Sequence, residues 1–548
     1  MSCSRREALA ALGALLAAPS MSTALAHAQD TQAADVLLGS AATFQAARLR
    51  GEVSAEQVLR MALDRCNGLG ASWRAIDCLS DTALAEARAS DERRRRGSLL
   101  GPLDGVPVFA KSIYDMRGLP TSASSREWTR LFPDAVPHDA VEVARLRAAG
   151  AVVLGKTAAD DFAYRGNGTS SHTGQVLNPY DASGQRTPGG SSAGAAVVVA
   201  GGMAFSALGT DDGGSNRIPA QFSGVVGMKP SFGLVPRSGV IPTWPYLDTH
   251  GPLARSVVDA ALMLWALVGA DGEDALSHDI GKEAMRALIP SNTSARGPWQ
   301  PAFSPDALRG RRLGIVDVHA PRAQMSTESV AQFERALADC RSAGAIVDVF
   351  DAPVTRVNVR ERFAETASAR GDVRPNPNSP AATANALYRY FARQGVDARA
   401  AAQRGHAAYR AFYDVLPTDW TAFEALLSAP YEQDAAGVSF ARSREQVVAQ
   451  LASAMRAERL DALVYPTMPF PAPLAVNPWP DVRTPLGYGN WMGLPEVSVP
   501  AGYDSQGMPL GNLSFVGLPG HDAALLAMAY AYEQQSRHFK PPAAVASR

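Results

Sequence analysis

Apolar and polar positions alternate along this chain with two different periods. Apolar residues one helical turn apart predict a helix over residues 140–149, which Asp139 caps, and the four apolar residues 151–154 after it predict a buried strand. The same succession of an amphipathic segment and a short apolar run recurs at 329–350 and at 451–466. Repeated units of helix and strand are typical of an α/β fold, in which a sheet lies between layers of helices.

The strand pattern disappears between about residues 375 and 456. Ala- and Arg-rich segments with helical spacing replace it, which predicts a helical insertion or a cap over a cleft. No internal repeat and no long linker divides the rest of the chain. We therefore expect one large domain over residues 29–548.

The N-terminal segment, residues 1–28, has a different character. It contains the pair Arg5 and Arg6, a weakly apolar run rich in Ala and Leu, and an A-x-A sequence that ends at Ala28. This layout is typical of a secretory signal peptide, and the arginine pair resembles a twin-arginine export signal. We expect a signal peptide over residues 1–28 and a periplasmic protein that begins at Gln29. An ordinary secretory signal and an uncut Ala-rich helix are the alternatives.

Composition excludes several classes of partner. Of 548 residues, 46% are hydrophobic and 19% are charged, and the formal net charge is −1, so nucleic acid is not an expected partner. No stretch after the signal segment reaches the roughly 18 apolar residues of a membrane helix, so we expect no stable membrane insertion. Histidines and cysteines lack metal-ligand spacings, so we expect no metal and no cofactor. A disulfide between Cys66 and Cys78 is left open.

The densest Gly and Ser content lies between residues 187 and 220. Two Gly/Ser loops there are separated by an apolar, helix-like run and a strand-like segment. Such loops let backbone N–H groups approach an anion closely. The chain has no G-x-x-x-x-G-K-[ST] sequence, and no G-x-G-x-x-G follows a strand and opens a helix. An oxyanion hole therefore fits these loops better than a nucleotide site does.

A serine in these loops needs a base if it is to act as a nucleophile. The loops contain no histidine, and the chain has only five lysines among its 52 basic residues. One of them, Lys111, ends the strand-like segment 105–111, where alternation puts it on the same face as Phe109. Burial favours the neutral form of a lysine, which is a competent base. The alternative is a lysine paired with a carboxylate at the end of the strand.

Five segments stand out by their order and spacing. They are GVPVFAK (105–111), GTSSHTGQVLNP (168–179), TPGGSSAG (187–194), GTDDGGSNRIP (209–219) and GMKPSFGLVPRSGVIP (227–242). Together they resemble the amidase signature family, which includes fatty acid amide hydrolase and bacterial peptide amidases, and the resemblance extends from about Thr43 to Lys540. It implies the α/β amidase signature fold, a central twisted mixed β-sheet flanked by helices on both faces, with a helical insertion.

The resemblance also implies a catalytic set of two serines and a lysine. Ser215 corresponds to the nucleophile and Lys111 to the base. Ser191 corresponds to a bridging serine, which would follow a cis peptide bond after Gly190. Lys111 would take a proton from Ser191, and Ser191 would take one from Ser215 as it attacks the amide carbonyl. Water would then hydrolyse the acyl-enzyme.

Further roles at the site come from the same resemblance. The backbone N–H groups that would hold the oxyanion are those of Asp212, Gly213, Gly214 and Ser215. Ala163, with Tyr164 beside it, would form the wall of the acyl pocket; the alternative is that both residues only pack.

Structural residues are expected around the same loop. Asp211 and Arg217 would pair to fix it, and Ser192 would lie near the site. Asp212 and Asn216 depart from the family, which commonly has Thr or an apolar residue at the first position and Ile or Val at the second. A carboxylate beside an oxyanion hole opposes the developing charge. We therefore expect the Asp212 side chain to point away or to face a polar or cationic group of the substrate.

The expected function is hydrolysis of a small carboxylic amide through an acyl-enzyme, giving an acid and an amine or ammonia. Aliphatic amides, aryl amides, carbamates, peptide amides and esters are all open as substrates. The expected assembly is a monomer or homodimer.

Three other functions compete with this one. The first is an α/β-hydrolase-type esterase, because residues 190–194, GSSAG, match G-x-S-x-G; that fold requires a strand directly before the motif. The second is an inactive exported binding protein of the amidase fold. The third, a subunit of a tRNA-dependent amidotransferase, is disfavoured by the predicted export.

Overall fold

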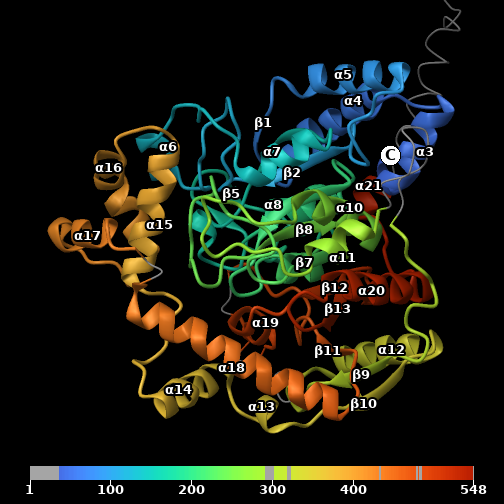
Figure 1. Ribbon diagram of the computed structural model, residues 1–548. Coiled ribbons are helices and arrows are strands. Elements are labelled where there is room, and N and C mark those ends of the chain that lie inside the picture. Colours follow the sequence, from blue (N-terminus) through green and yellow to red (C-terminus); the bar gives the residue numbers. More distant parts are fainter. Residues whose placement is uncertain are drawn as a thin grey trace, which may run out of the picture.

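The computed structural model describes residues 36–289, 301–317, 322–430, 433–476, 479–480 and 484–546. The predicted signal peptide, residues 1–28, lies outside these residues. Most of the described chain surrounds one large sheet, with helices above and below it (Figure 1).

The central sheet has eleven strands. In spatial order they are β1 (Ile76–Leu79), β3 (Val152–Thr157), β2 (Pro107–Lys111), β6 (Ser206–Thr210), β8 (His250–Ala254), β7 (Val226–Lys229), β12 (Glu496–Tyr503), β13 (Pro509–Val516), β11 (Ala462–Pro466), β9 (Arg312–Ile315) and β10 (Ile346–Val349). Strands pair in parallel on both sides of β2 and again among β11, β9 and β10, whereas every pair from β6 to β11 is antiparallel. A separate short pair is formed by β4 (Thr169–Ser170) and β5 (Gly174–Gln175).

Helices cover both faces of this sheet. On one face, neighbouring helices contact one another in the order α7 (Val141–Ala148), α10 (Val257–Leu267), α20 (Asp522–Ser536) and α12 (Thr327–Ser342). On the other face lie α8 (Ala193–Ala200) and α9 (Arg217–Phe222), which pack against each other. This arrangement confirms the predicted α/β fold with a mixed sheet between helices.

The other helices lie around this core. They are α3 (Ala41–Arg50), α4 (Ala55–Arg65), α5 (Ala83–Arg96), α6 (Arg126–Leu131), α11 (Lys282–Ala287), α13 (Pro353–Arg356), α14 (Val359–Arg370), α15 (Pro380–Arg393), α16 (Ala398–Arg410), α17 (Trp420–Leu427), α18 (Ala435–Ala457), α19 (Leu486–Met492) and α21 (Ala543–Ala546), with a π-turn at Cys66–Gly70 and 3₁₀ turns at Asp161–Ala163 and Arg322–Gln324. Figure 1 shows α15, α16 and α17 at the left edge of the molecule, with the long helix α18 running beneath the sheet. The segment expected to be a helical insertion, residues 375–456, thus consists of α15 to α18 and their connections where the structure describes it.

One local prediction about the first helix–strand unit is wrong. Helix α7 and strand β3 form where the apolar pattern places them, but Asp139 does not cap the helix. Its Oδ1 instead accepts the backbone N–H of Arg117 at 2.8 Å, and no side chain caps α7. The sequence could not show this, because the competing donor lies in a separate loop.

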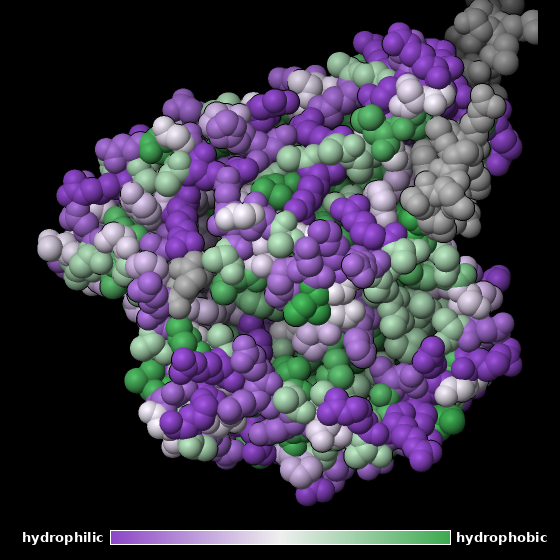
Figure 2. Space-filling model, viewed as in Figure 1, coloured by the Kyte–Doolittle hydropathy of each residue, from purple (hydrophilic) through white to green (hydrophobic). Residues whose placement is uncertain are grey.

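Two further questions from the sequence concern a disulfide bond and membrane-spanning helices. Among the described residues Cys66, Cys78 and Cys340 are free thiols, so the disulfide between Cys66 and Cys78 does not form. Within the same residues, no helix combines the length and the apolar character needed to cross a bilayer. Figure 2 shows hydrophilic side chains over much of the visible face, with apolar ones in small groups between them.

Candidate active site

The expected nucleophile lies in a tight loop between β6 and α9. Ser215 is 8% exposed and lines a cavity of about 1040 Å³. The loop needs glycine at Gly214, whose φ of +118° is open to few other residues and whose added Cβ would lie 2.6 Å from a methyl group of Leu486. The loop therefore brings the Ser215 side chain to the cavity, where a substrate can reach it.

The expected base is buried next to this loop. Lys111 is the last residue of β2 and is fully buried, and its Nζ lies 2.7 Å from Ser191 Oγ and 2.8 Å from Thr210 Oγ1. No carboxylate of the described residues forms an ion pair with it. The structure therefore does not show the alternative, in which the lysine is paired with a carboxylate at the end of the strand. Burial lowers the pKa of Lys111 to about 8.

The expected bridging serine stands at the start of a buried helix. Ser191 follows a cis peptide bond after Gly190, as the resemblance implied. Helix α8 begins two residues later, and all eight of its residues are buried, because the sequence AGAAVVVA is apolar on every side. The backbone N–H of Ser192 donates to the carbonyl of Ser215 at 3.1 Å and so ties the two serine loops together.

Ser192 itself has a structural position. Its Oγ is fully buried, 3.2 Å from the carbonyl of Thr210 and 3.1 Å from Oδ1 of Asn216. Asn216 in turn donates from Nδ2 to the carbonyls of Met228 and Gly251. The departure at Asn216 therefore anchors the loop to the neighbouring strands.

The expected oxyanion donors need one correction. The backbone N–H of Gly214 donates to Asp211 Oδ1 at 2.7 Å, so it is not free to bind an oxyanion. The N–H groups of Asp212, Gly213 and Ser215 have no acceptor in the described part of the chain. The structure thus leaves three of the four expected donors available.

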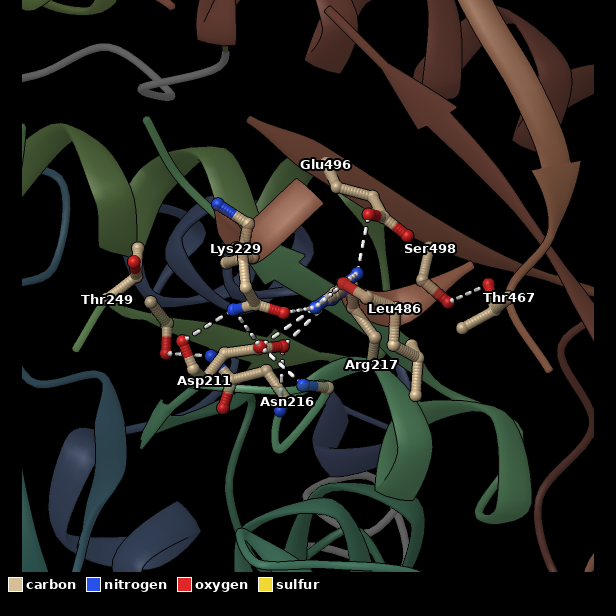
Figure 3. Close-up of polar contacts among 12 residues, drawn as sticks. Asp211, Asn216, Arg217, Lys229, Thr249, Thr467, Leu486, Glu496 and Ser498 are labelled. Carbon is tan, nitrogen blue, oxygen red and sulfur yellow. Dashed lines mark hydrogen bonds and ion pairs between the residues drawn. The ribbon is translucent and has the colours of Figure 1, made fainter. Parts of the chain in front are cut away.

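Asp211 and Arg217 form the ion pair that the resemblance implied. Figure 3 shows the guanidinium between Asp211 on one side and Glu496 of β12 on the other. It bonds both oxygens of Asp211 at 2.9 Å and Oε2 of Glu496 at 2.6 Å, and all three side chains are fully buried. Burial alone would raise the pKa of Asp211, but the charge and hydrogen bonds of Arg217 outweigh it and hold that pKa well below its ordinary value.

Asp212 has a different environment from its neighbour. Strands β6 and β8 pair Thr210 with His250, and the N–H of Asp211 donates to the carbonyl of Thr249, so the same register places Asp212 opposite Asp248. No described group donates a hydrogen bond to either carboxyl oxygen of Asp212. Its pKa is raised well above the ordinary value, first by burial and then by the charge of Asp248.

Several residues at the site had no signal in the sequence. Asp248, whose carboxylate accepts the N–H groups of Thr243 and Trp244, reaches the loop only through sheet pairing. Glu496 is 279 residues from Arg217 along the chain. Thr210 lies within the segment 209–219, but its contact with Lys111 depends on how the ends of β2 and β6 meet and was not predicted.

The expected pocket wall is at the cavity. Ala163 and Tyr164 both line it, and Ala163 has a positive φ of +59° in the 3₁₀ turn that carries it. The Tyr164 ring packs near Trp244 and Tyr413, which gives this wall an aromatic surface.

The esterase alternative required a strand immediately before GSSAG. Residues 176–192 contain no strand, and β5 ends at Gln175, so the strand–turn–helix arrangement of a nucleophile elbow is absent from this described segment.

Comparison with known proteins places this geometry in a wider context. A family model described as Amidase matches residues 57–526. A glutamyl-tRNA(Gln) amidotransferase subunit of Moorella thermoacetica is 34% identical over 508 residues, which cover 90% of this chain and 95% of that protein. The corresponding subunit of Myxococcus xanthus is 34% identical over 514 residues, covering 89% and 96%. The solved peptide amidase of Stenotrophomonas maltophilia matches with a TM-score of 0.74 and 31% identity, over 92% of this chain and 98% of its own.

These relatives contradict the predicted location. The two curated proteins are subunits of a cytoplasmic enzyme, so the prediction of a periplasmic protein is wrong. The argument from export against an amidotransferase subunit loses its basis with it. Because these relatives are subunits by name, a monomer or homodimer stays a prediction.

Proposed function

The chain belongs to the amidase signature family, and from this premise we propose that it hydrolyses a carboxylic amide with Ser215 as nucleophile, Ser191 as proton relay and Lys111 as base. One observation carries the assignment. Lys111 is a fully buried amine without an ion-pair partner among the described residues, and its Nζ lies 2.7 Å from Ser191 Oγ. A pKa of about 8 leaves roughly one tenth of it neutral at pH 7 and half at pH 8, as a general base requires.

The reaction begins with two proton transfers. Neutral Lys111 accepts the proton of Ser191 Oγ, Ser191 accepts that of Ser215 Oγ, and the Ser215 oxygen bonds to the amide carbonyl carbon. The carbonyl oxygen becomes an oxyanion that the N–H groups of Asp212, Gly213 and Ser215 stabilise, each by roughly 3–4 kcal/mol.

The second half of the reaction reverses the relay. The C–N bond breaks, and the proton held by Lys111 returns through Ser191 to the departing nitrogen, which leaves as amine or ammonia. Water then attacks the acyl-enzyme, gives its proton to the relay, and releases the acid with Ser215 restored.

The test is a panel of substrates in which each compound represents one class of leaving group. Purified protein is assayed on aryl amides, C-terminal peptide amides, carbamates and matched esters, and Ser215→Ala is assayed beside it. We expect hydrolysis of at least one amide class that Ser215→Ala abolishes, while Ser183→Ala, an exposed serine in the loop before the site, retains it. Amide hydrolysis that survives Ser215→Ala contradicts the proposal.

A second candidate function follows from the curated relatives. Their 34% identity over about nine-tenths of this chain favours a subunit that supplies an amide group to glutamyl-tRNA(Gln). The similarity to a peptide amidase, at a TM-score of 0.74, favours an enzyme that hydrolyses amides itself. Sedimentation and turnover of the isolated chain separate the two, because a subunit would show little amide hydrolysis without further chains, whereas the proposed amidase is active as a monomer or homodimer.

A further inference from the structure

Three arginines line the cavity above Ser215. Arg165 follows the turn that carries Ala163, Arg360 lies in the first turn of α14, and Arg374 lies between α14 and α15. All three side chains are exposed, and none forms an ion pair with an acidic residue that the structure describes. Arginines elsewhere in the fold commonly do so, as with Arg237 on Asp274 and Arg370 on Asp372.

The positions of these arginines do not depend on acidic neighbours. The Arg360 guanidinium lies 5.6 Å from the centre of the Trp491 ring, which also lines the cavity. The N-terminal end of the twelve-residue helix α14 borders the same space, where the helix dipole adds positive potential. The cavity mouth therefore carries three arginines that form no ion pair with a described acidic residue, together with the positive end of a helix.

The described lining contains one acidic residue, Asp212. It lies opposite Asp248 in the continued register of β6 and β8, where two like charges would repel, and no donor reaches its oxygens. Asp248, in contrast, accepts two backbone N–H groups, those of Thr243 and Trp244. Burial and the facing carboxyl of Asp248 raise the pKa of Asp212, which favours its protonated form.

This pairing changes the role that we assign to Asp212. The sequence suggested a carboxylate that would point away or face a cationic part of the substrate. In its protonated form this carboxyl neither opposes the oxyanion nor attracts a cation. The net charge along the described cavity wall then comes from Arg165, Arg360 and Arg374.

We propose that the substrate of this site is an amide that also carries a carboxylate, which the arginines at the cavity mouth bind. The inference rests on the proposed amide hydrolysis and specifies its substrate class. A planar guanidinium pairs with a carboxylate through two parallel hydrogen bonds, and a cavity of about 1040 Å³ has room for a group of that kind beside the scissile amide. The remaining wall, with Trp244, Tyr488 and Trp491, suits the uncharged part of the molecule.

Three anilides of equal chain length test the charge preference. They are N-(4-nitrophenyl)succinamate, which is anionic, N-(4-nitrophenyl)butanamide, which is neutral, and 4-amino-N-(4-nitrophenyl)butanamide, which is cationic. After correction for their alkaline hydrolysis rates, we expect kcat/KM to be about tenfold or more higher for the anion than for the neutral amide, and lowest for the cation. The preference should shrink as salt rises to about 0.5 M. N-butanoyl-4-aminobenzoate against N-phenylbutanamide tests a carboxylate on the amine side.

Variants locate the preference in the cavity. Arg165→Gln, Arg360→Gln and Arg374→Gln should each lower the anionic-to-neutral ratio severalfold, with the neutral rate within about twofold of the parent. Arg335→Gln, which removes an exposed charge from α12 outside the cavity lining, should leave the ratio unchanged. Equal rates for anion and neutral amide on both the acyl and the amine side overturn the inference, as do arginine variants that change both rates equally.

A binding measurement keeps this test separate from the test of the reaction. The Ser215→Ala variant should bind N-(4-nitrophenyl)succinamate at least several times more tightly than N-(4-nitrophenyl)butanamide by calorimetry. Tighter binding of the anion without turnover in the parent protein would support the arginine site and contradict the proposed function. Turnover of neutral amides together with equal affinity for both compounds would support the proposed amide hydrolysis and contradict the arginine site.

Discussion

Asp211 and Asp212 are neighbours in the chain and lie in opposite environments. Behind the loop, Asp211 accepts hydrogen bonds from Arg217, Gly214, Asn216 and Asn490, and its charge is fixed. In front of it, Asp212 receives no donor, faces another carboxyl, and borders the cavity. Both side chains are buried, so burial does not explain the difference.

The difference is one of pairing. A buried charge with a complete set of partners holds a backbone in one shape, whereas a buried titratable group without them can exchange a proton. The rear of the loop belongs to the first kind, with Arg217 between two carboxylates (Figure 3). The front belongs to the second kind, because Lys111 and Asp212 both lie there with shifted pKa values and without an ion pair in the described chain.

The largest expected effect comes from removing the front amine. Lys111→Met should lower kcat for an amide by about 10⁴-fold, because the relay loses its base while the similar volume of methionine keeps the packing. Thermal unfolding should show a loss of stability no greater than that of the control variant described next, because each of the two buried amines makes two hydrogen bonds that methionine cannot make.

A second buried lysine provides the matched control. Lys156, on β3, is also fully buried, but its Nζ donates to the carbonyl of Pro120 and to Thr121 Oγ1, away from the cavity lining. Lys156→Met should retain kcat within about tenfold and lose stability through the unpaired acceptors. Equal losses of kcat in the two variants would mean that Lys111 has only a structural role.

The next effect comes from breaking the rear of the loop. Asp211→Asn should lower the free energy of unfolding by about 3–5 kcal/mol, because it leaves Arg217 with one carboxylate and turns an amide group toward the N–H donors of Gly214 and Asn216. Urea unfolding followed by tryptophan fluorescence measures it. A loss below about 1 kcal/mol would show that this network does not hold the loop.

Substitution of the neighbouring Asp212 should raise the free energy of unfolding instead of lowering it. The pKa of Asp212 is raised on folding, so the carboxyl favours the folded state fully only below its unfolded pKa of about 4, and that contribution is lost as pH rises. Asp212→Asn removes this loss and can still donate to Asp248. We expect it to stabilise the protein by about 1–3 kcal/mol at pH 8, with the gain vanishing near pH 4. Destabilisation at pH 8 would indicate an ionised Asp212 with a favourable partner.

The smallest expected effect concerns the pH profile of catalysis. Because the pKa of Lys111 is about 8, kcat/KM for a neutral anilide should rise with pH and level off above that value. If Asp212 is already uncharged, Asp212→Asn should move the midpoint of this rise in kcat/KM by less than about half a pH unit. A downward shift of one unit or more would show that a charged Asp212 holds the proton on Lys111.

The sequence predicted those parts of the site that depend on local pattern. The apolar run before Lys111 predicted a strand with the amine on its inner face, and the Gly-rich segment before Ser215 predicted a loop with free N–H groups. The helix–strand alternation likewise predicted the layers of the fold.

Contacts between distant strands could not be predicted in this way. Asp248 reaches Asp212 through the register of β6 and β8, and Glu496 reaches Arg217 through the neighbouring strands β7 and β12. The use of the Gly214 N–H by Asp211 depends on a side-chain direction inside the loop. The Asp139 cap failed for the same reason, since its partner Arg117 belongs to another segment.

The most direct test of the account is the site of covalent labelling by a fluorophosphonate. The parent protein and its Ser192→Ala variant are treated with the probe and digested, and the modified peptide is identified by mass spectrometry. We predict a single adduct on Ser215 in both proteins, and slow or absent labelling in Lys111→Met. An adduct on Ser191 or Ser192 with Ser215 unmodified, or labelling that is as fast without Lys111 as with it, would contradict the proposed nucleophile and its relay.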